Sequence, residues 1–202
     1  MNELLPVWRG LDVWRAEAAS VAPIGTRLFA NGNQLGVDPR PYRLTYDLRT
    51  GEDYVTEELR VKAWSGGWDR ELVVARSAEG GWSVDMVERG EGAPAWQEPA
   101  TDGLSDALDC DLGFSPFFNS MPVLRHGLHE GGEAREFVMT WISVPDLAVR
   151  RSEQRYTPVG AGTVNFTSGD FSADIHFDEH GLVSLYEDFL ERVAANREGG
   201  SR

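Results

Sequence analysis

Residues 171–178 read FSADIHFD, and the alternation in this stretch decides the fold class of the chain. Phe171, Ala173, Ile175 and Phe177 are apolar, whereas the residues between them are polar or charged. Because successive side chains of a β-strand point to opposite faces of the sheet, this pattern predicts a strand with one buried and one solvated face.

The same period of two recurs throughout the chain. It appears at residues 42–48, 59–63, 137–141 and 164–166. Residues 72–86 contain two apolar runs separated by the turn Ala-Glu-Gly-Gly, which is typical of a hairpin. Strands joined by short turns favour a mainly β fold with antiparallel pairing.

A helical period is clear in one segment, residues 182–196. Leu182, Leu185, Phe189 and Val193 follow helical spacing there and predict a C-terminal helix. One helix cannot cover a long sheet, so the sheet must curl, close or enclose a cavity. We therefore expect a single large curved antiparallel sheet or incomplete β-barrel with a C-terminal helix. It forms one domain over residues 1–202, with a frayed tail at 197–202.

Composition narrows the possible functions. The chain has 202 residues, 41% of them hydrophobic, and a net charge of −14 without a basic run. This charge disfavours nucleic-acid binding, which depends on clustered cations. Because no 18 apolar residues run together and no export signal is recognisable, we expect a cytoplasmic protein without an integral membrane segment. The single cysteine, Cys110, fits a reducing compartment. The oligomeric state stays open.

Motifs of catalysis and metal binding are weak. His176 and His180 would converge on a metal only in a helix, and the alternation predicts a strand there. The acids on either side of Cys110 raise a thiol pKa, the opposite of what a nucleophile needs. No phosphate-binding loop or nucleophile elbow occurs, so we expect no metal, no cofactor and no assigned catalytic residue.

The stretch 109–128, DCDLGFSPFFNSMPVLRHGL, carries a family resemblance. Together with Trp141-Ile142-Ser143-Val144-Pro145-Asp146-Leu147, Gln154-Arg155-Tyr156 and residues 171–193, it resembles the putative glycolipid-binding family of bacterial proteins. The resemblance implies a curved sheet similar to that of periplasmic lipoprotein carriers, whose incomplete barrel holds acyl chains. Residues 109–128 would then form a polar crossover at the rim of a cavity.

The leading hypothesis is binding of a small amphipathic ligand, possibly a glycolipid, in the concave face of the sheet. Aromatic rings would cover the ligand while polar groups hydrogen-bond its head. The candidate ligand-binding residues are Asp109, Asp111, Ser115, Asn119, Arg125, Trp141, Gln154 and Tyr156.

Other interpretations of these residues stay open. Ser115 and Asn119 are ordinary turn formers, and Arg125 is a natural partner for the nearby acids. An alternative function is an enzyme acting on a sugar or lipid conjugate, with Asp109 or Asp111 as acid or base. A further alternative is an interaction domain whose aromatics fill the sheet interior.

Overall fold

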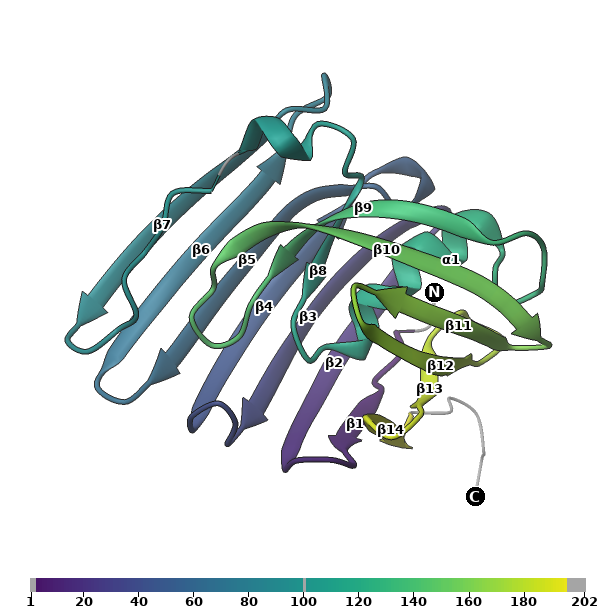
Figure 1. The fold of residues 1–202 in the computed structure, drawn as a ribbon, viewed down its shortest axis with the longest axis horizontal. Helices are drawn as coiled ribbons and strands as arrows, with labels where there is room; N and C mark the ends of the chain where they lie inside the picture. The colour runs from purple at the N-terminus through teal and green to yellow at the C-terminus, as the bar shows by residue number, and fades with distance from the viewer. Residues whose placement is uncertain (1–2, 100, 196–202) are drawn as a thin grey trace.

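The computed structural model describes residues 3–99 and 101–195, which form one 14-stranded sheet (Figure 1). The strands are β1 (Val7–Gly10), β2 (Arg15–Ile24), β3 (Arg27–Gly36), β4 (Tyr42–Thr50), β5 (Thr56–Ser65), β6 (Trp68–Arg76), β7 (Trp82–Gly90), β8 (Asp109–Leu112), β9 (Arg135–Ile142), β10 (Val149–Gly160), β11 (Thr163–Ser168), β12 (Phe171–Phe177), β13 (Val183–Tyr186) and β14 (Leu190–Ala194). Their order in the sheet is β7-β6-β5-β4-β3-β2-β1-β14-β13-β12-β11-β10-β9-β8. The sheet is strongly curved and not closed, which confirms the expected mainly β architecture.

The sheet is antiparallel except at one end. β8 pairs with β9 in the parallel sense, from Asp109 opposite Met139 to Leu112 opposite Ile142. A parallel pair needs a crossover connection, and here the crossover contains the 3₁₀ helix η3 (Pro116–Asn119) and the α-helix α1 (Ser120–His126). Among the described strands, this pair departs from the antiparallel pairing of the rest of the sheet.

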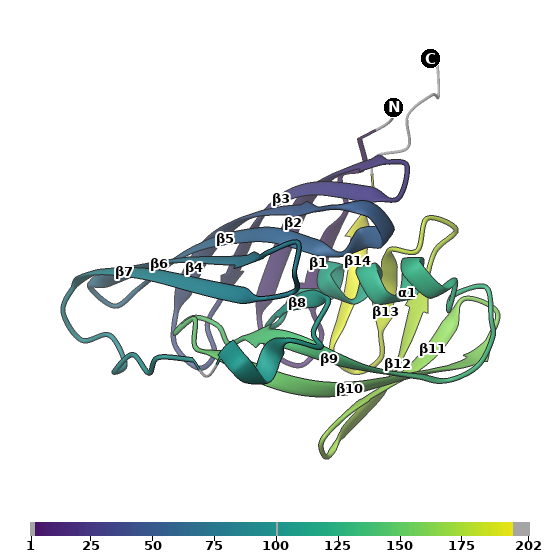
Figure 2. The ribbon, with the colours of Figure 1, turned by 90° about the horizontal axis from the view of Figure 1, so that it is seen from above.

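The sheet folds over itself into two arms. We call β2 to β7 the first arm and β9 to β12 the second arm, and β1, β14 and β13 connect them. Figure 2 shows the two arms facing each other with η3 and α1 between them. The crossover thus covers the concave face of the sheet, which the strands alone would leave open.

The helix expected over 182–196 is not there. Residues Val183–Tyr186 and Leu190–Ala194 are β13 and β14, joined by a turn in which Asp188 has a φ of 58°. β14 pairs with β1, and the indole Nε1 of Trp8 in β1 donates to the carbonyl of Val183 at 2.8 Å. These tertiary pairings outweigh a helical apolar spacing. The short helix of this half of the chain is α1, and the expected frayed tail lies outside the described residues.

Aromatic rings from η3 fill the space between the arms. Phe117 and Phe118 are fully buried, and their centroids lie 6.4 and 5.3 Å from the ring of Tyr46 in β4. Edge-to-face and offset arrangements of this kind add to the free energy gained by burying the apolar surface. The crossover is therefore part of the hydrophobic core.

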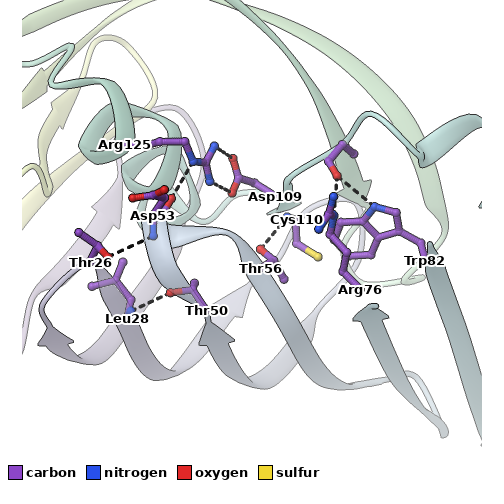
Figure 3. Close-up of polar contacts among 11 residues, drawn as sticks. Thr26, Leu28, Thr50, Asp53, Thr56, Arg76, Trp82, Asp109, Cys110 and Arg125 are labelled. Atoms are coloured by element: carbon purple, nitrogen blue, oxygen red, sulfur yellow. Dashed lines mark hydrogen bonds and ion pairs between the residues drawn. The ribbon is translucent and has the colours of Figure 1, made fainter. Parts of the chain in front are cut away.

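An ion pair fastens α1 to β8. The guanidinium of Arg125 donates from Nη1 and Nη2 to the carboxylate of Asp109, at 2.8 and 2.5 Å (Figure 3). Its Nε donates to the carbonyl of Asp53 at 2.7 Å, in the loop before β5. Both paired side chains are almost wholly buried, with 8% and 1% of their surfaces exposed.

β8 and the residue before it are also hydrogen-bonded to β5 in the first arm. Thr56 at the start of β5 donates its N–H to the carbonyl of Leu108 at 3.0 Å. Its Oγ1 accepts the N–H of Cys110 at 3.1 Å (Figure 3). The last strand of the sheet thus contacts a strand far from it in the sheet order.

No helix in the described ranges has the length and hydrophobicity needed to cross a bilayer.

The replacement Arg125→Ala would leave the buried carboxylate of Asp109 without its cation. We expect it to lower the free energy of unfolding by about 3 to 5 kcal/mol, the typical cost of an uncompensated buried charge. Urea denaturation followed by tryptophan fluorescence measures the loss. The control is Arg155→Ala, because Arg155 pairs with Glu136 at an exposed site and its loss should cost under about 1 kcal/mol. Equal losses of stability in the two variants would contradict the stabilising role of the buried Arg125–Asp109 ion pair.

Candidate functional site

A cavity of about 530 Å³ lies on the concave side, between the second arm and the segment 111–119. Its lining divides into two parts by chemistry. One part, which we call the aromatic wall, consists of Phe114, Phe166, Phe171, Tyr186 and Phe189. The other part, the polar wall, consists of Asp111, Ser115, Asn119, Ser152 and Gln154. The indole of Trp141 also lines the cavity.

The aromatic wall is a continuous set of ring contacts. The centroids of Tyr186 and Phe189 are 5.2 Å apart, those of Phe166 and Phe171 are 6.1 Å apart, and that of Phe114 lies 6.3 Å from Phe189. Phe171 is 46% exposed, although its ring contacts three other members of the wall. An exposed ring in such a cluster gives the cavity an apolar edge that reaches solvent.

Arg15 in β2 supports this wall from behind. Its guanidinium carbon lies 4.6 Å from the ring centroids of both Phe114 and Phe189, and its nitrogens donate to the carboxylate of Asp12. Phe114 has a φ of 63°, a conformation that L-residues rarely adopt. The cation–π contacts help to hold the Phe114 ring in place despite this backbone.

The polar wall is linked by a chain of hydrogen bonds. Asn119 Nδ2 donates to the hydroxyl of Tyr156 at 2.9 Å, and that hydroxyl donates to Gln154 Oε1 at 3.1 Å. Gln154 Nε2 then donates to Asp111 Oδ2 at 2.6 Å. Burial raises the pKa of the Asp111 carboxyl to about 6, although the bond from Gln154 opposes the rise.

Another buried carboxylate, Glu17, lies behind the polar wall. It is 3% exposed and accepts hydrogen bonds from Ser115 Oγ at 2.7 Å, Tyr46 Oη at 2.8 Å and Gln34 Nε2 at 3.3 Å. It forms no ion pair within the described part of the chain. Burial therefore raises its pKa from 4.5 to about 7, against the lowering effect of its three donors.

Glycines allow the tyrosines to reach these groups across β3. A Cβ atom on Gly32 would lie 2.3 Å from the Tyr46 ring, and one on Gly36 would lie 2.5 Å from the ring of Tyr42. The bare backbone lets Tyr46 cross β3 to Glu17 in β2. Tyr42 likewise reaches Gln34 Oε1, to which its hydroxyl donates at 2.8 Å.

The structure brings together most of the residues that the sequence singled out. Asp111, Ser115, Asn119, Trp141 and Gln154 line the cavity. Tyr156 is fully buried and contacts the polar wall through its hydroxyl.

Asp109 and Arg125 do not line this cavity, because they bind each other at the far end of β8 and α1. This is the acid–arginine pairing that the sequence left open for Arg125. Cys110 is fully buried, and burial raises the pKa of its thiol. In residues 3–99 and 101–195, no three His, Cys, Asp or Glu side chains are grouped so as to hold a metal ion.

Sequence reasoning missed Glu17 and the aromatic wall. The signal for Glu17 was present, because Glu17 alternates with Ala19 and Val21 on the buried face of β2. An acidic residue at a strand position where apolar residues predict burial indicates a side chain that has hydrogen-bond or ion-pair partners in the interior. No comparable sequence pattern singled out Phe114, because the side chains that contact it come from distant parts of the chain.

A second hollow, of about 710 Å³, lies at the ends of the first-arm strands. Trp14, Trp64 and Trp68 line it, and Trp14 is 62% exposed. It is more open to solvent than the cavity lined by the aromatic wall and the polar wall. That less open cavity is therefore the better candidate site.

Glu17 makes stability depend on pH. A carboxyl whose pKa is raised on folding holds its proton in the folded state, so stability falls as pH rises from about 4.5 to about 7. We expect Glu17→Gln to remove a loss of about 3 kcal/mol between pH 5 and pH 8 and thus flatten the pH dependence. Urea unfolding at both pH values measures it. Glu136→Gln, at an exposed position, should keep the wild-type slope, and an unchanged slope in Glu17→Gln would contradict the assignment.

Comparison with known proteins supports the family resemblance. The model of the family described as "Putative glycolipid-binding" matches residues 6–192. A crystal structure of a DUF1089 family protein from Pseudomonas aeruginosa superposes with a TM-score of 0.67 at 27% identity, over 88% of this chain and 92% of that one. A search of curated proteins finds no match. On the extent of the family match, this chain belongs to the putative glycolipid-binding family.

Proposed function

We propose that this protein binds an amphipathic ligand, a glycolipid in the simplest case, in the cavity between the second arm and residues 111–119. The observation that carries the proposal is the division of one cavity into an aromatic wall and a polar wall. A ligand with an apolar and a polar part matches both walls at once, whereas a purely polar or purely apolar ligand leaves one wall unmatched. The name of the family points in the same direction.

The size of the cavity agrees with this function. Its volume of about 530 Å³ is within the usual range for small-molecule sites, about 300–1,000 Å³. The aromatic wall would shield an apolar chain from water, which supplies most of the binding free energy. The polar wall offers oriented hydrogen-bonding groups rather than bulk hydrophobic surface, and such groups provide specificity.

Two alternatives are less well supported. An acid–base enzyme needs two ionisable groups that converge on one substrate, and Asp111 is the one carboxylate lining this cavity in the described ranges. The carboxylate of Asp109 is ion-paired with Arg125, and that of Glu17 accepts hydrogen bonds from three side chains. An interaction domain would have no need for the open space that remains between the second arm and residues 111–119.

Native mass spectrometry after gentle purification tests the proposal, and we expect a co-purifying ligand or binding from a glycolipid panel. Ser152 lines the cavity on β10, with its hydroxyl 3.2 Å from that of Ser168. Ser152→Trp should fill the cavity and weaken ligand binding by about tenfold or more, equivalent to 1.4 kcal/mol. Ser83→Trp, at an exposed site on β7, is the control and should bind like wild type. Absence of binding by the wild type, or equal binding by Ser152→Trp, would overturn the proposal.

A further inference from the structure

We propose that the polar end of the ligand is an uncharged, hydroxyl-bearing group bound by Asp111 and Trp141, with the apolar chain along the aromatic wall. This inference rests on the proposed function and adds the orientation of the ligand and the charge class of its head. The argument comes from the direction of the hydrogen bonds, the position of the indole and the charges around the cavity.

The hydrogen-bond chain of the polar wall runs in one direction. Asn119, Tyr156 and Gln154 each donate to the next member, and Asp111 is the last acceptor. The side-chain carbonyl oxygen of Gln154 accepts the hydrogen bond from Tyr156, so the amide nitrogen of Gln154 is directed at Asp111 Oδ2. Asp111 Oδ1 has no partner among the described residues. The carboxylate is thus held in a fixed orientation with one free acceptor oxygen beside the cavity.

Such an acceptor can take a donor from the ligand. Asp111 Oδ1 is not among the fully buried polar atoms without a partner, so solvent reaches it in the free protein, and a ligand that covers it without donating a bond would leave it desolvated and unpaired. A hydroxyl group restores the missing bond, and bonds to charged acceptors are about twice as strong as neutral ones. The free oxygen of Asp111 therefore favours ligands that carry hydroxyl groups.

Trp141 provides a flat aromatic surface in the same cavity. Asp111 and Trp141 are directly paired across the parallel strands β8 and β9, and both line the cavity. The apolar face of a sugar ring packs well on an indole, while its equatorial hydroxyls project outward to polar groups. A carboxylate beside an aromatic face therefore matches a ring with one apolar face and several hydroxyl donors.

The charges around the cavity disfavour an anionic head. Arg151 is paired with Asp106 and Glu153 at 2.6 and 3.3 Å, so its charge is already compensated. Arg150 also lines the cavity, but its side chain is exposed and its charge is screened by solvent. Asp111 is more buried and is not ion-paired in the described structure, so its repulsion of an anion is less screened.

Two amphiphiles with the same chain test this inference at neutral pH. Dodecyl maltoside has an uncharged sugar head and dodecanoate an anionic one, and isothermal titration below their critical micelle concentrations measures both affinities. We expect the wild type to bind the maltoside more tightly. Asp111→Asn, which conserves shape, should weaken maltoside binding by about tenfold because a hydrogen bond to a charged acceptor is lost. The same variant should bind dodecanoate equally well or better.

Two further variants separate the possible outcomes. Trp141→Leu should weaken the maltoside alone, and Phe171→Ala should weaken both amphiphiles because it shortens the aromatic wall. If neither amphiphile nor any other lipid binds, the proposed function itself fails. If both amphiphiles bind and Asp111→Asn and Trp141→Leu affect them equally or not at all, the ligand-binding function stands and the head-group assignment is overturned. Tighter binding of dodecanoate by the wild type would likewise overturn it, in favour of Arg150.

Discussion

The buried carboxylate of Glu17 is the constraint around which the interior is arranged. It lies on β2 and accepts hydrogen bonds from β3, from β4 and from Ser115, which precedes η3. Without these donors, burial of an acid that forms no ion pair in the described structure would be prohibitive. The bond from Ser115 also places the crossover against the first arm, so the position of the polar wall follows from it. One buried group thereby connects the packing of the sheet to the shape of the cavity.

The fold could be predicted from the sequence wherever one face of a strand is buried. The alternation at 42–48, 137–141 and 171–177 corresponds to strands β4, β9 and β12. The prediction failed at 182–196 because a hairpin can reproduce a helical spacing: the tight turn around Asp188 places Tyr186 and Leu190 four residues apart on the same buried face. Such a turn at a non-glycine residue has no clear sequence signal.

The site was only partly predictable for a related reason. Asp109 and Asp111 are two residues apart on β8, so alternation places both carboxylates on the same side of the strand. Their surroundings differ because α1 brings Arg125 to Asp109, whereas β10 brings Gln154 to Asp111. The sequence does not reveal either neighbour, because both hydrogen bonds join segments that are 16 and 43 residues apart in the chain. Local patterns identified the strand but could not assign a structural role to one acid and a cavity position to the other.

The two uncompensated carboxylates of the interior differ in the extent to which the protein satisfies them. Glu17 has three donors and lies almost entirely out of solvent, so it has little capacity left for a ligand. Asp111 has one donor and borders open space. The second oxygen of Asp111 is neither fully buried nor hydrogen-bonded within the described structure, so it can exchange water for a donor from a ligand. The capacity for a further hydrogen bond therefore lies with Asp111 and not with Glu17, and the ligand-binding proposal depends on this difference.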